Sequence, residues 1–345
     1  MQAYPEKERA LWHLFERRTF EDGIALDNVA TEQILDLLDY PEYFRLTRQP
    51  LPENRSSILE KLCADRLLQT GTGSRYAISN LGAILFARKL TDFGRLQHRG
   101  LRVVFFNGKD RTGSITEQVA GKLGYAIGFK RAIDWINARL PANEIIKGAL
   151  RQEVRLYPEL AIREIVANAL IHQDFTISGT CPKVEIFEGR IEVSNPGVPL
   201  IEPNRFMDMQ PKSRNPALAS LMRRMGMCEE LGTGIDKVVR SVEEFQLPPP
   251  DFRVSGENML VILFAPRSFA EMDRDERVRA CYQHACLQFV SGNKMSNASL
   301  RQRLGIKESN YPQASLIIKD AINNNLVKPN EEGAGANKTY VPFWA

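Results

Sequence analysis

Apolar residues recur at helical spacing through the first part of this 345-residue chain. The spacing predicts short helices over 31–38, 52–66 and 80–89, with a glycine-containing hairpin over 71–78 between the last two. Helix, helix and hairpin in this order are typical of a winged helix. We favour the alternative, an element that only packs against the next domain, because the segment has no dense basic face.

The pattern changes at residue 101, where LRVVFF predicts a buried strand. Apolar residues at helical intervals then predict a helix over 117–140, so that a βα unit opens a central domain. The stretch 145–156 predicts a pair of strands. A further helix is predicted to begin at Tyr157-Pro158, since proline is tolerated in a first helical turn.

The rest of the central region predicts two strands, then two helices and a final strand, and a proline-rich stretch between the second strand and the first helix is expected to form a loop or lid over 196–216. Glu188-Gly189 is a sequence suited to a tight hairpin between the first two strands. The predicted elements are strands over 183–187, 190–194 and 259–264 and helices over 216–225 and 235–245.

Residues from 268 onward predict three helices and a closing hairpin. The helices are expected over 271–290, 299–304 and 311–323, followed by 326–342 with a Gly-Ala-Gly tip. This is a second and clearer winged-helix pattern. We therefore predict three domains, over 1–95, 96–267 and 268–345.

Composition places the protein among soluble intracellular proteins. Hydrophobic residues make up 43% and charged residues 26%, and no apolar run approaches the roughly 20 residues of a membrane span. Residues 1–16 lack the features of a secretory signal, so a cytoplasmic protein without membrane contact is expected. The five cysteines include no CxxC spacing and the four histidines are far apart, which indicates reduced thiols rather than disulfides or a zinc site.

The net charge of +4 says little about nucleic acid, so the case for DNA depends on the last domain. Seven basic and four acidic residues follow position 290. The second helix of a winged helix enters the major groove, and here this is the helix over 309–323. The expected DNA contacts are Lys307, Asn310, Tyr311, Gln313, Lys319 and Lys338, and the further phosphate contacts expected are Lys294, Arg301, Arg303 and Lys328. The alternative is a winged helix used for dimerisation or protein contact.

The helix after Pro158 carries three polar residues four positions apart. In REIVANALIHQDF, Glu164, Asn168 and His172 share one face because i,i+4 residues stack along a helix. A carboxylate can polarise an attacking water, and a neutral carboxamide can ligate magnesium without repelling phosphates. By itself this spacing is more often a solvated helix face.

The order of elements favours a catalytic role for Glu164 and Asn168 over a solvated helix face. The helix is followed by the hairpin, the lid and then Glu230-Leu231-Gly232-Thr233-Gly234 at the start of another helix. Glycines allow a backbone to approach phosphate closely, and a helix N-terminus supplies amides and a positive dipole end. We therefore include Gly232, Thr233 and Gly234 in a candidate nucleotide site.

Three blocks, REIVANALIHQDF, IEVSNPG and RNPALASLMRRMGMCEELGTGIDKV, together resemble a known family. It is the Schlafen/AlbA-type family of bacterial transcriptional regulators. Their ATP-binding domain is often called RecG C-terminal-like and is grouped with gyrase, histidine kinases and MutL in the GHKL class. The resemblance implies an α/β fold, a two-layer α+β sandwich with helices on one face of a mixed sheet, flanked by mainly helical winged-helix modules. It also implies an AlbA-like domain ahead of this region, which we expect this chain to lack.

The resemblance assigns a role to each motif residue, with ATP and Mg²⁺ as cofactors. Glu164 would be the general base, Asn168 the magnesium ligand, Asn195 and Gly197 the adenine-side box, and Gly232 with Gly234 the phosphate loop; His172 and Thr233 would lie at the same site, and Arg214 and Asn215 would belong to the lid. One departure is that gyrase-like enzymes have aspartate where this chain has Asn195. A neutral acceptor binds adenine less strongly than a carboxylate does.

We expect the protein to be an ATP-binding, DNA-binding transcriptional regulator. It is expected to form a homo-oligomer, most simply a dimer. Weak ATPase activity is left open. Nucleotide would close the lid and change the arrangement of the winged helices on DNA. Two alternatives remain: an interaction scaffold with a degenerate pocket, and an accessory ATPase of a nucleic-acid-processing or phage-defence system. A helicase is disfavoured because the chain has no G-x-x-x-x-G-K-[ST] phosphate loop.

Overall fold

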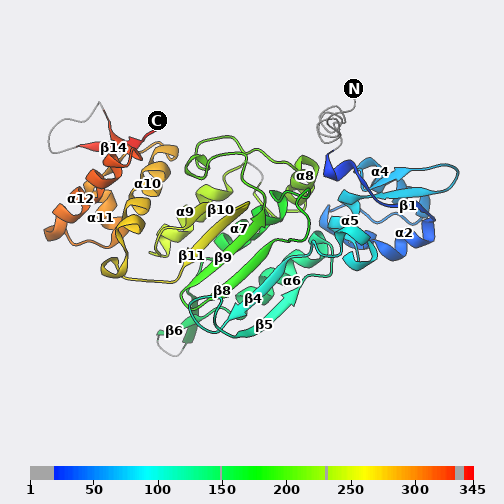
Figure 1. Cartoon of the computed structure of the whole chain (residues 1–345), viewed down its shortest axis with the longest axis horizontal. Helices are drawn as coiled ribbons and strands as arrows, with labels where there is room; N and C mark the ends of the chain where they lie inside the picture. Colours follow the sequence, from blue (N-terminus) through cyan, green and yellow to red (C-terminus); the bar gives the residue numbers. More distant parts are fainter. Residues whose placement is uncertain (1–18, 148–149, 230–231, 331–337) are drawn as a thin grey trace, which may run out of the picture.

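The computed structural model describes residues 19–147, 150–229, 232–330 and 338–345 (Figure 1). Three features considered in the sequence fall outside these ranges: the N-terminal segment 1–16, the pair 230–231 ahead of the glycine turn, and the tip at 333–335. Within the described ranges, no helix has both the length and the apolar character that crossing a membrane requires.

The N-terminal part forms a small antiparallel sheet of order β1-β3-β2 with helices packed around it, drawn in blue and cyan in Figure 1. Side-chain caps explain where two of the helices begin, since Asn54 accepts a hydrogen bond from the Ser57 amide at 2.7 Å and Ser79 accepts one from the Gly82 amide at 2.9 Å. The elements are η1 (Phe20–Asp22), β1 (Ile24–Val29), α2 (Thr31–Leu37), α3 (Tyr40–Leu46), α4 (Arg55–Ala64), β2 (Leu68–Thr70), β3 (Tyr76–Ser79), α5 (Asn80–Phe86), η2 (Leu90–Asp92) and η3 (Gly94–Leu96).

The central part is built on a six-stranded mixed sheet of order β10-β11-β9-β8-β4-β5. Only β4 and β8 run parallel, and the other neighbouring strands in this sheet are antiparallel. The strands are β4 (Arg102–Phe106), β5 (Ile115–Ala120), β8 (Lys183–Phe187), β9 (Arg190–Pro196), β10 (Asp251–Ser255) and β11 (Asn258–Phe264), and a separate hairpin consists of β6 (Ala142–Lys147) and β7 (Leu150–Arg155).

The two faces of this sheet differ in character because side chains alternate along each strand. Val103, Val184, Val193 and Val261 lie directly opposite one another across four strands, and three of them are buried in the main core. The other face carries charge: the Arg111 guanidinium bonds to the Glu185 carboxylate at 2.7 Å.

Helices cover the apolar face, which gives the expected two-layer α/β arrangement. They are α6 (Tyr125–Asn137), α7 (Glu159–Ile171), α8 (Pro216–Arg224) and α9 (Gly234–Glu244), and a short 3-10 turn, η4 (Pro203–Arg205), lies between β9 and α8. The predicted amphipathic character of α7 is confirmed, because Ile162, Ile165, Val166 and Leu170 are all buried. The helix therefore fixes its polar ridge by packing its apolar side into the core.

The C-terminal part has its own hydrophobic core and lies at the opposite end of the molecule from the N-terminal part (Figure 1). A three-stranded sheet of order β12-β14-β13 packs with three helices. The elements are η5 (Phe269–Glu271), α10 (Arg274–Val290), β12 (Met295–Ser296), α11 (Asn297–Leu304), η6 (Glu308–Asn310), α12 (Tyr311–Asn323), β13 (Val327–Pro329) and β14 (Thr339–Pro342). This element order agrees with the predicted order; the winged-helix assignment and the domain boundaries stay predictions.

The structure corrects one predicted helix. Residues 117–140 do not form a single helix: β5 ends at Ala120 and α6 begins at Tyr125. Val119 and Leu123 fit helical spacing, but Gly121 and Gly124 interrupt it, and Gly124 lies so close to the Leu85 carbonyl that a side chain could not fit. The sequence pattern also missed α3, β1, β10 and β12, and Pro158 precedes α7 as its N-cap instead of lying in the first turn.

Candidate functional site

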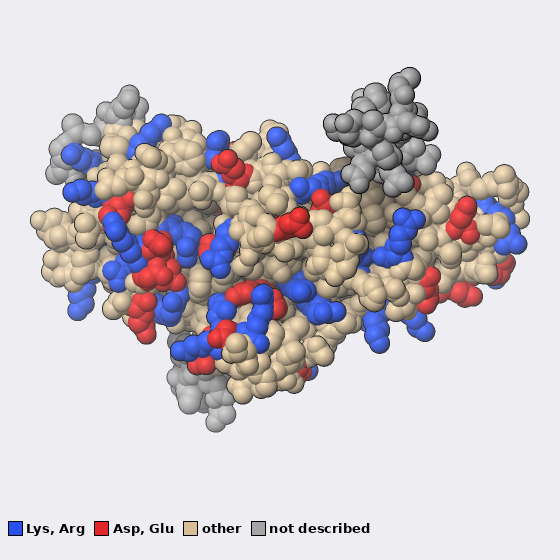
Figure 2. All heavy atoms as spheres, in the orientation of Figure 1, with Lys and Arg blue, Asp and Glu red and all other residues tan. Residues whose placement is uncertain are grey.

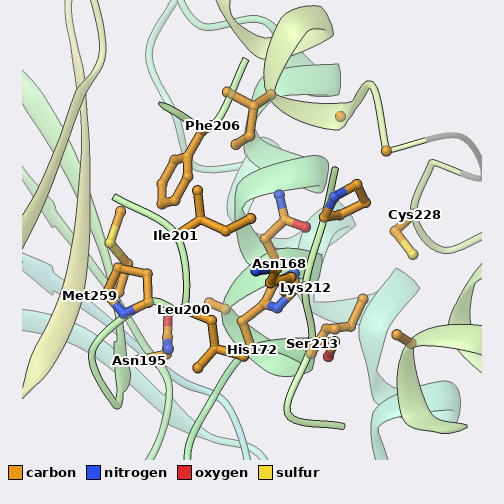
Figure 3. Close-up of a pocket in the computed structure, with 18 of the residues that line it drawn as sticks. Asn168, His172, Asn195, Leu200, Ile201, Phe206, Lys212, Ser213, Cys228 and Met259 are labelled. Atoms are coloured by element: carbon orange, nitrogen blue, oxygen red, sulfur yellow. The ribbon is translucent and has the colours of Figure 1, made fainter. Parts of the chain in front are cut away.

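Helix α7 presents its polar ridge to a cavity of about 290 Å³ between the helix, the sheet and the lid. Glu164, Asn168 and His172 all line this cavity, and Figure 3 shows Asn168 and His172 on the same helix, facing lid residues. A cavity near 300 Å³ is at the lower end of the size range of small-molecule sites. The ridge predicted from i,i+4 spacing is therefore a cavity wall, not a solvated helix face.

Most of the other predicted site residues converge on the same cavity. Asn195 and Gly197 reach it from the end of β9, Arg214 from the lid, and Gly232 and Gly234 from the start of α9. From Glu164 to Gly234 the lining residues named so far span 70 positions of the chain (234 − 164), so only the fold brings them together.

Two predicted residues do not line the cavity. Asn215 is buried, and its Nδ2 donates hydrogen bonds to the carbonyl oxygens of Ile171 and Gln173, both at 2.8 Å. It thereby ties the end of the lid to the end of α7. Thr233 is the N-cap residue of α9 but makes no side-chain capping bond.

Glu164 lies where the cavity meets the start of α9. The residue is 2% exposed, and Oε2 accepts a long hydrogen bond of 3.4 Å from the Glu229 amide. A Cβ atom at Gly234 would lie 2.9 Å from the same oxygen, so the missing side chain allows the helix end to approach the carboxylate. Burial raises the pKa of Glu164 above its ordinary value, and a raised pKa suits a carboxylate to accept a proton near neutral pH.

His172 is neutral at physiological pH. Burial, reinforced by the positive charges of Arg214 and Arg223, lowers its pKa to about 4. A neutral imidazole can both donate and accept hydrogen bonds. His172 therefore adds polarity to the cavity wall without adding charge.

At the sheet end of the cavity, Asn195 on β9 pairs with Met259 on β11. The Asn195 side chain is buried, and its Nδ2 donates to the Pro196 carbonyl at 3.2 Å. That bond leaves the Oδ1 atom to accept a hydrogen bond from a ligand, and Figure 3 shows Asn195 beside Met259 and Leu200 at the cavity wall. Gly197 has a φ of +102°, and a Cβ there would lie 2.7 Å from the Asp174 side chain, so only glycine fits.

The glycine turn before α9 meets the lid. Gly232 has a φ of +76°, and a Cβ atom there would lie 2.7 Å from the Pro211 ring. Pro211 of the lid therefore lies directly against this turn. Because α9 begins at Gly234, its free amides and positive dipole end are directed toward the same region of the cavity.

The cavity has lining residues that the sequence patterns did not identify. Lys212 of the lid and Arg223 of α8 add positive charge, and these apolar side chains also line the cavity: Leu200, Ile201, Phe206, Met209 and Phe252. The double arginine at the end of α8 is the one visible sequence signal for Arg223. Nothing in the local pattern marks the apolar residues, because their partners come from distant strands.

The C-terminal residues predicted to contact DNA are all solvent-exposed: Lys307, Asn310, Tyr311, Gln313, Lys319 and Lys338. Tyr311, at the start of α12, is 60% exposed, which is unusual for a large aromatic residue. On the face shown in Figure 2, basic and acidic side chains are interspersed over this part of the molecule. Any DNA contact would therefore depend on particular side chains more than on a broad positive field.

Arg303, predicted to be a further phosphate contact, does not reach the surface. It is 6% exposed, its Nε lies 3.3 Å from the Glu243 carboxylate, and its Nη2 donates to the Leu247 carbonyl at 2.7 Å. That prediction was wrong because position 303 faces α9 of the central part. Its charge holds two parts of the chain together.

Comparison with known proteins bears on the central part of the chain. The family described as "Putative ATP-dependent DNA helicase recG C-terminal" matches residues 179–263. The match begins just before β8 and ends one residue before the end of β11. It includes Asn195 and the glycine turn but not α7. This stretch is therefore similar to an ATPase domain, as the sequence blocks indicated.

Among solved structures, the DIP2311 protein from Corynebacterium diphtheriae shares 16% sequence identity with a TM-score of 0.56. The similarity covers 97% of this chain and 67% of that one. At this identity the likeness concerns the fold alone. No curated protein matches this chain.

Proposed function

We propose that this protein binds Mg-ATP in the cavity beside α7 and that the bound nucleotide, with slow hydrolysis, changes how the C-terminal part engages double-stranded DNA. One observation carries the nucleotide site: Glu164, Asn168, Asn195 and the turn at Gly232 and Gly234 line a single cavity. The similarity of residues 179–263 to an ATPase domain supports it independently.

The residues fit a magnesium nucleotide. In the described part of the chain no hydrogen bond engages the Asn168 carboxamide, so its oxygen is available to a Mg²⁺ ion, which would offset phosphate charge. Gly232 and Gly234 give the phosphates access to backbone amides at the start of α9. Glu164 would accept a proton from a water molecule as the water oxygen attacks the terminal phosphorus and ADP leaves.

The base would lie at the sheet end of the cavity. The bond from Asn195 Nδ2 to the Pro196 carbonyl fixes the orientation of the carboxamide, and its Oδ1 can then accept a hydrogen bond from a base with an amino group, such as adenine. Ile201, Phe206 and Met259 provide apolar surface for a purine ring. We therefore expect adenine nucleotides to bind better than guanine nucleotides.

Calorimetric titration with Mg-ATP tests the site. We expect saturable binding to the wild-type protein and to Glu164→Gln, with hydrolysis reduced at least about 100-fold in the variant. If neither protein binds ATP, the proposed function fails. If Glu164→Gln hydrolyses ATP at the wild-type rate, Glu164 is not the base.

Two contacts provide a route from the cavity to the C-terminal part. The first runs through the lid: the Tyr282 hydroxyl on α10 donates to the Asn204 carbonyl, and Met207 packs against the C-terminal core. Movement of the lid on binding nucleotide would therefore act directly on α10.

The second contact runs through α9, which begins at the glycine turn and ends against the C-terminal part. Glu243 near its end contacts His284 Nδ1 at 3.0 Å and Arg303 Nε at 3.3 Å, and His284 Nε2 lies 3.1 Å from the Ser299 hydroxyl at the start of α11. One helix thus connects the candidate phosphate site to the helices predicted to bind DNA.

DNA binding itself can be measured by fluorescence anisotropy with a duplex of mixed sequence. We expect affinity to fall with salt and to differ between the ATP-bound and nucleotide-free protein. Lys319→Ala should weaken binding and reduce the slope of log affinity against log salt by about 1. Light scattering of the same samples would test the predicted dimer.

A second candidate function is an interaction scaffold with a degenerate pocket. Asn195 favours it, because a neutral amide replaces the aspartate of gyrase-like enzymes and accepts a weaker hydrogen bond. The titration separates the two candidates, since a scaffold would show no saturable binding of Mg-ATP.

A further inference from the structure

Lys212 occupies an unusual position in the lid, the segment Pro196–Pro216. The residue before it, Pro211, lies against Gly232 of the glycine turn, and Lys212 lines the same cavity as Asn168 and His172 (Figure 3). The side chain is nevertheless solvent-exposed. Lys212 is therefore at the end of the cavity where the phosphates of a nucleotide would lie, not at the end near Asn195.

The other cations around the cavity are already paired or lie on a fixed helix. Arg214 donates to the Val198 carbonyl at 2.6 Å and lies 3.6 Å from the Asp174 carboxylate, and Lys237 is paired with Glu229. Arg223 faces the cavity from α8, a helix that is not part of the lid.

Lys212 differs from these residues in two ways. It has no carboxylate at ion-pair distance within the part of the chain that the structure describes. It also lies on a segment that contacts the C-terminal part, through the Asn204 carbonyl and Met207. A ligand held by Lys212 would therefore be attached to the lid itself.

We propose that Lys212 binds the terminal phosphate of the nucleotide and so makes the lid discriminate between the triphosphate and the diphosphate. This inference rests on the proposed nucleotide site. A flexible ammonium side chain at the phosphate end gains a charge-assisted hydrogen bond only when the third phosphate is present. Hydrolysis removes that phosphate and with it the contact to Lys212. The lid is then free to move, and its contact with α10 changes.

Titration calorimetry with magnesium and either a non-hydrolysable ATP analogue or ADP tests the inference. For Lys212→Met we expect the affinity for the analogue to fall about 10- to 100-fold and the affinity for ADP to change less than about 3-fold. Lys212→Arg should retain most of the affinity for the analogue because the charge is kept. Lys89→Met, an equal charge change at an exposed position outside the cavity, should leave both affinities unchanged.

Hydrogen exchange over 197–215 provides a second readout. The analogue should slow exchange of the lid in the wild-type protein and not in Lys212→Met, while ADP should have the same small effect on both. Equal loss of affinity for analogue and ADP, or no loss for either, overturns the role of Lys212 even if the site binds nucleotide. Absence of any binding by the wild-type protein overturns the proposed function first, and this inference with it.

Discussion

At the scale of single residues, glycine decides how closely the elements of the cavity approach. Gly232 takes a positive φ beside the Pro211 ring, and Gly234 leaves space for the Glu164 carboxylate. The two positions differ in what a side chain would meet. At Gly232 it would meet a proline ring and a strained backbone, whereas at Gly234 it would meet the movable end of a carboxylate.

Gly234→Ala should therefore affect chemistry more than stability. Alanine is the better helix former, so the free energy of unfolding should change by less than about 1 kcal/mol. The new Cβ would displace the Glu164 carboxylate, and the rate of ATP hydrolysis should fall at least about 10-fold. Gly128→Ala on α6 is the matched control, because its Cβ would make only ordinary contacts with Leu123, and it should leave hydrolysis unchanged.

His172 should make stability depend on pH. Its pKa of about 4 in the folded protein is below the ordinary value of 6.5, so the unfolded chain binds the proton more readily. The resulting stability is complete above pH 6.5 and is lost as the pH falls toward 4. The variant His172→Gln lacks this titrating group, whereas all other titratable groups are present in both the variant and the wild-type protein.

Urea unfolding of both proteins at pH 7 and pH 4.5 measures the effect. The stability of the wild-type protein relative to His172→Gln should fall between pH 7 and pH 4.5 by as much as about 2.5 kcal/mol. A constant difference between the two proteins would show that the imidazole is not protected from protonation in the fold.

At the scale of elements, the N-terminal part holds the helix that follows the lid. The buried carboxylate of Glu21, from η1, accepts hydrogen bonds from the backbone amides of Ala217 at 3.1 Å and of Leu218. It thereby caps the start of α8 from a position almost 200 residues earlier in the chain. The rings of Phe20 and Phe175 stack beside it, with centroids 3.8 Å apart.

Glu21→Gln should destabilise the protein by about 1–2 kcal/mol, because the amide is a weaker acceptor for the free donors of α8. Glu32→Gln removes a carboxylate that forms an exposed ion pair with Arg55 and should change stability by less than about 0.5 kcal/mol. Chemical denaturation of the two variants compares them directly. Equal effects would mean that the cap contributes no more than a surface charge.

Helices and strands were predicted correctly from the sequence where the apolar residues followed a single clear period. The hairpin at Glu188-Gly189 and helices α7 and α12 were found at nearly the predicted residues. It failed for β5, where apolar residues four apart fit both a strand and a helix. It also failed for β10, a short edge strand whose residues are mostly polar and exposed.

At the scale of the whole molecule, the three parts lie in a row and contact each other through particular side chains (Figure 1). Arg303 is the clearest case, since it pairs with Glu243 of α9 while lying on α11. Arg303 is buried and Glu243 is mostly shielded from solvent, so loss of the arginine removes a desolvated ion pair and leaves His284 as the other partner of Glu243.

Arg303→Met should separate nucleotide binding from its effect on DNA. We expect ATP affinity to change less than about 3-fold, because Arg303 does not line the cavity, and the difference in DNA affinity between ATP-bound and nucleotide-free protein to disappear. Arg274→Met is the matched control, since Arg274 is exposed and pairs with Asp320 within the C-terminal part at 2.7 Å. A variant that keeps the full nucleotide effect on DNA would exclude coupling through α9.

The local features of this protein follow from short-range patterns in its amino-acid sequence. Periodicity placed α7 and its ridge of Glu164, Asn168 and His172, and glycine and proline placed the turn and the lid, because these signals depend on neighbours a few residues away. Which of these features come together depends on long-range packing. Asn195, Pro211 and Gly232 converge because strand pairing and core packing join distant segments, and the same packing buries Arg303, whose charge alone had indicated a surface role.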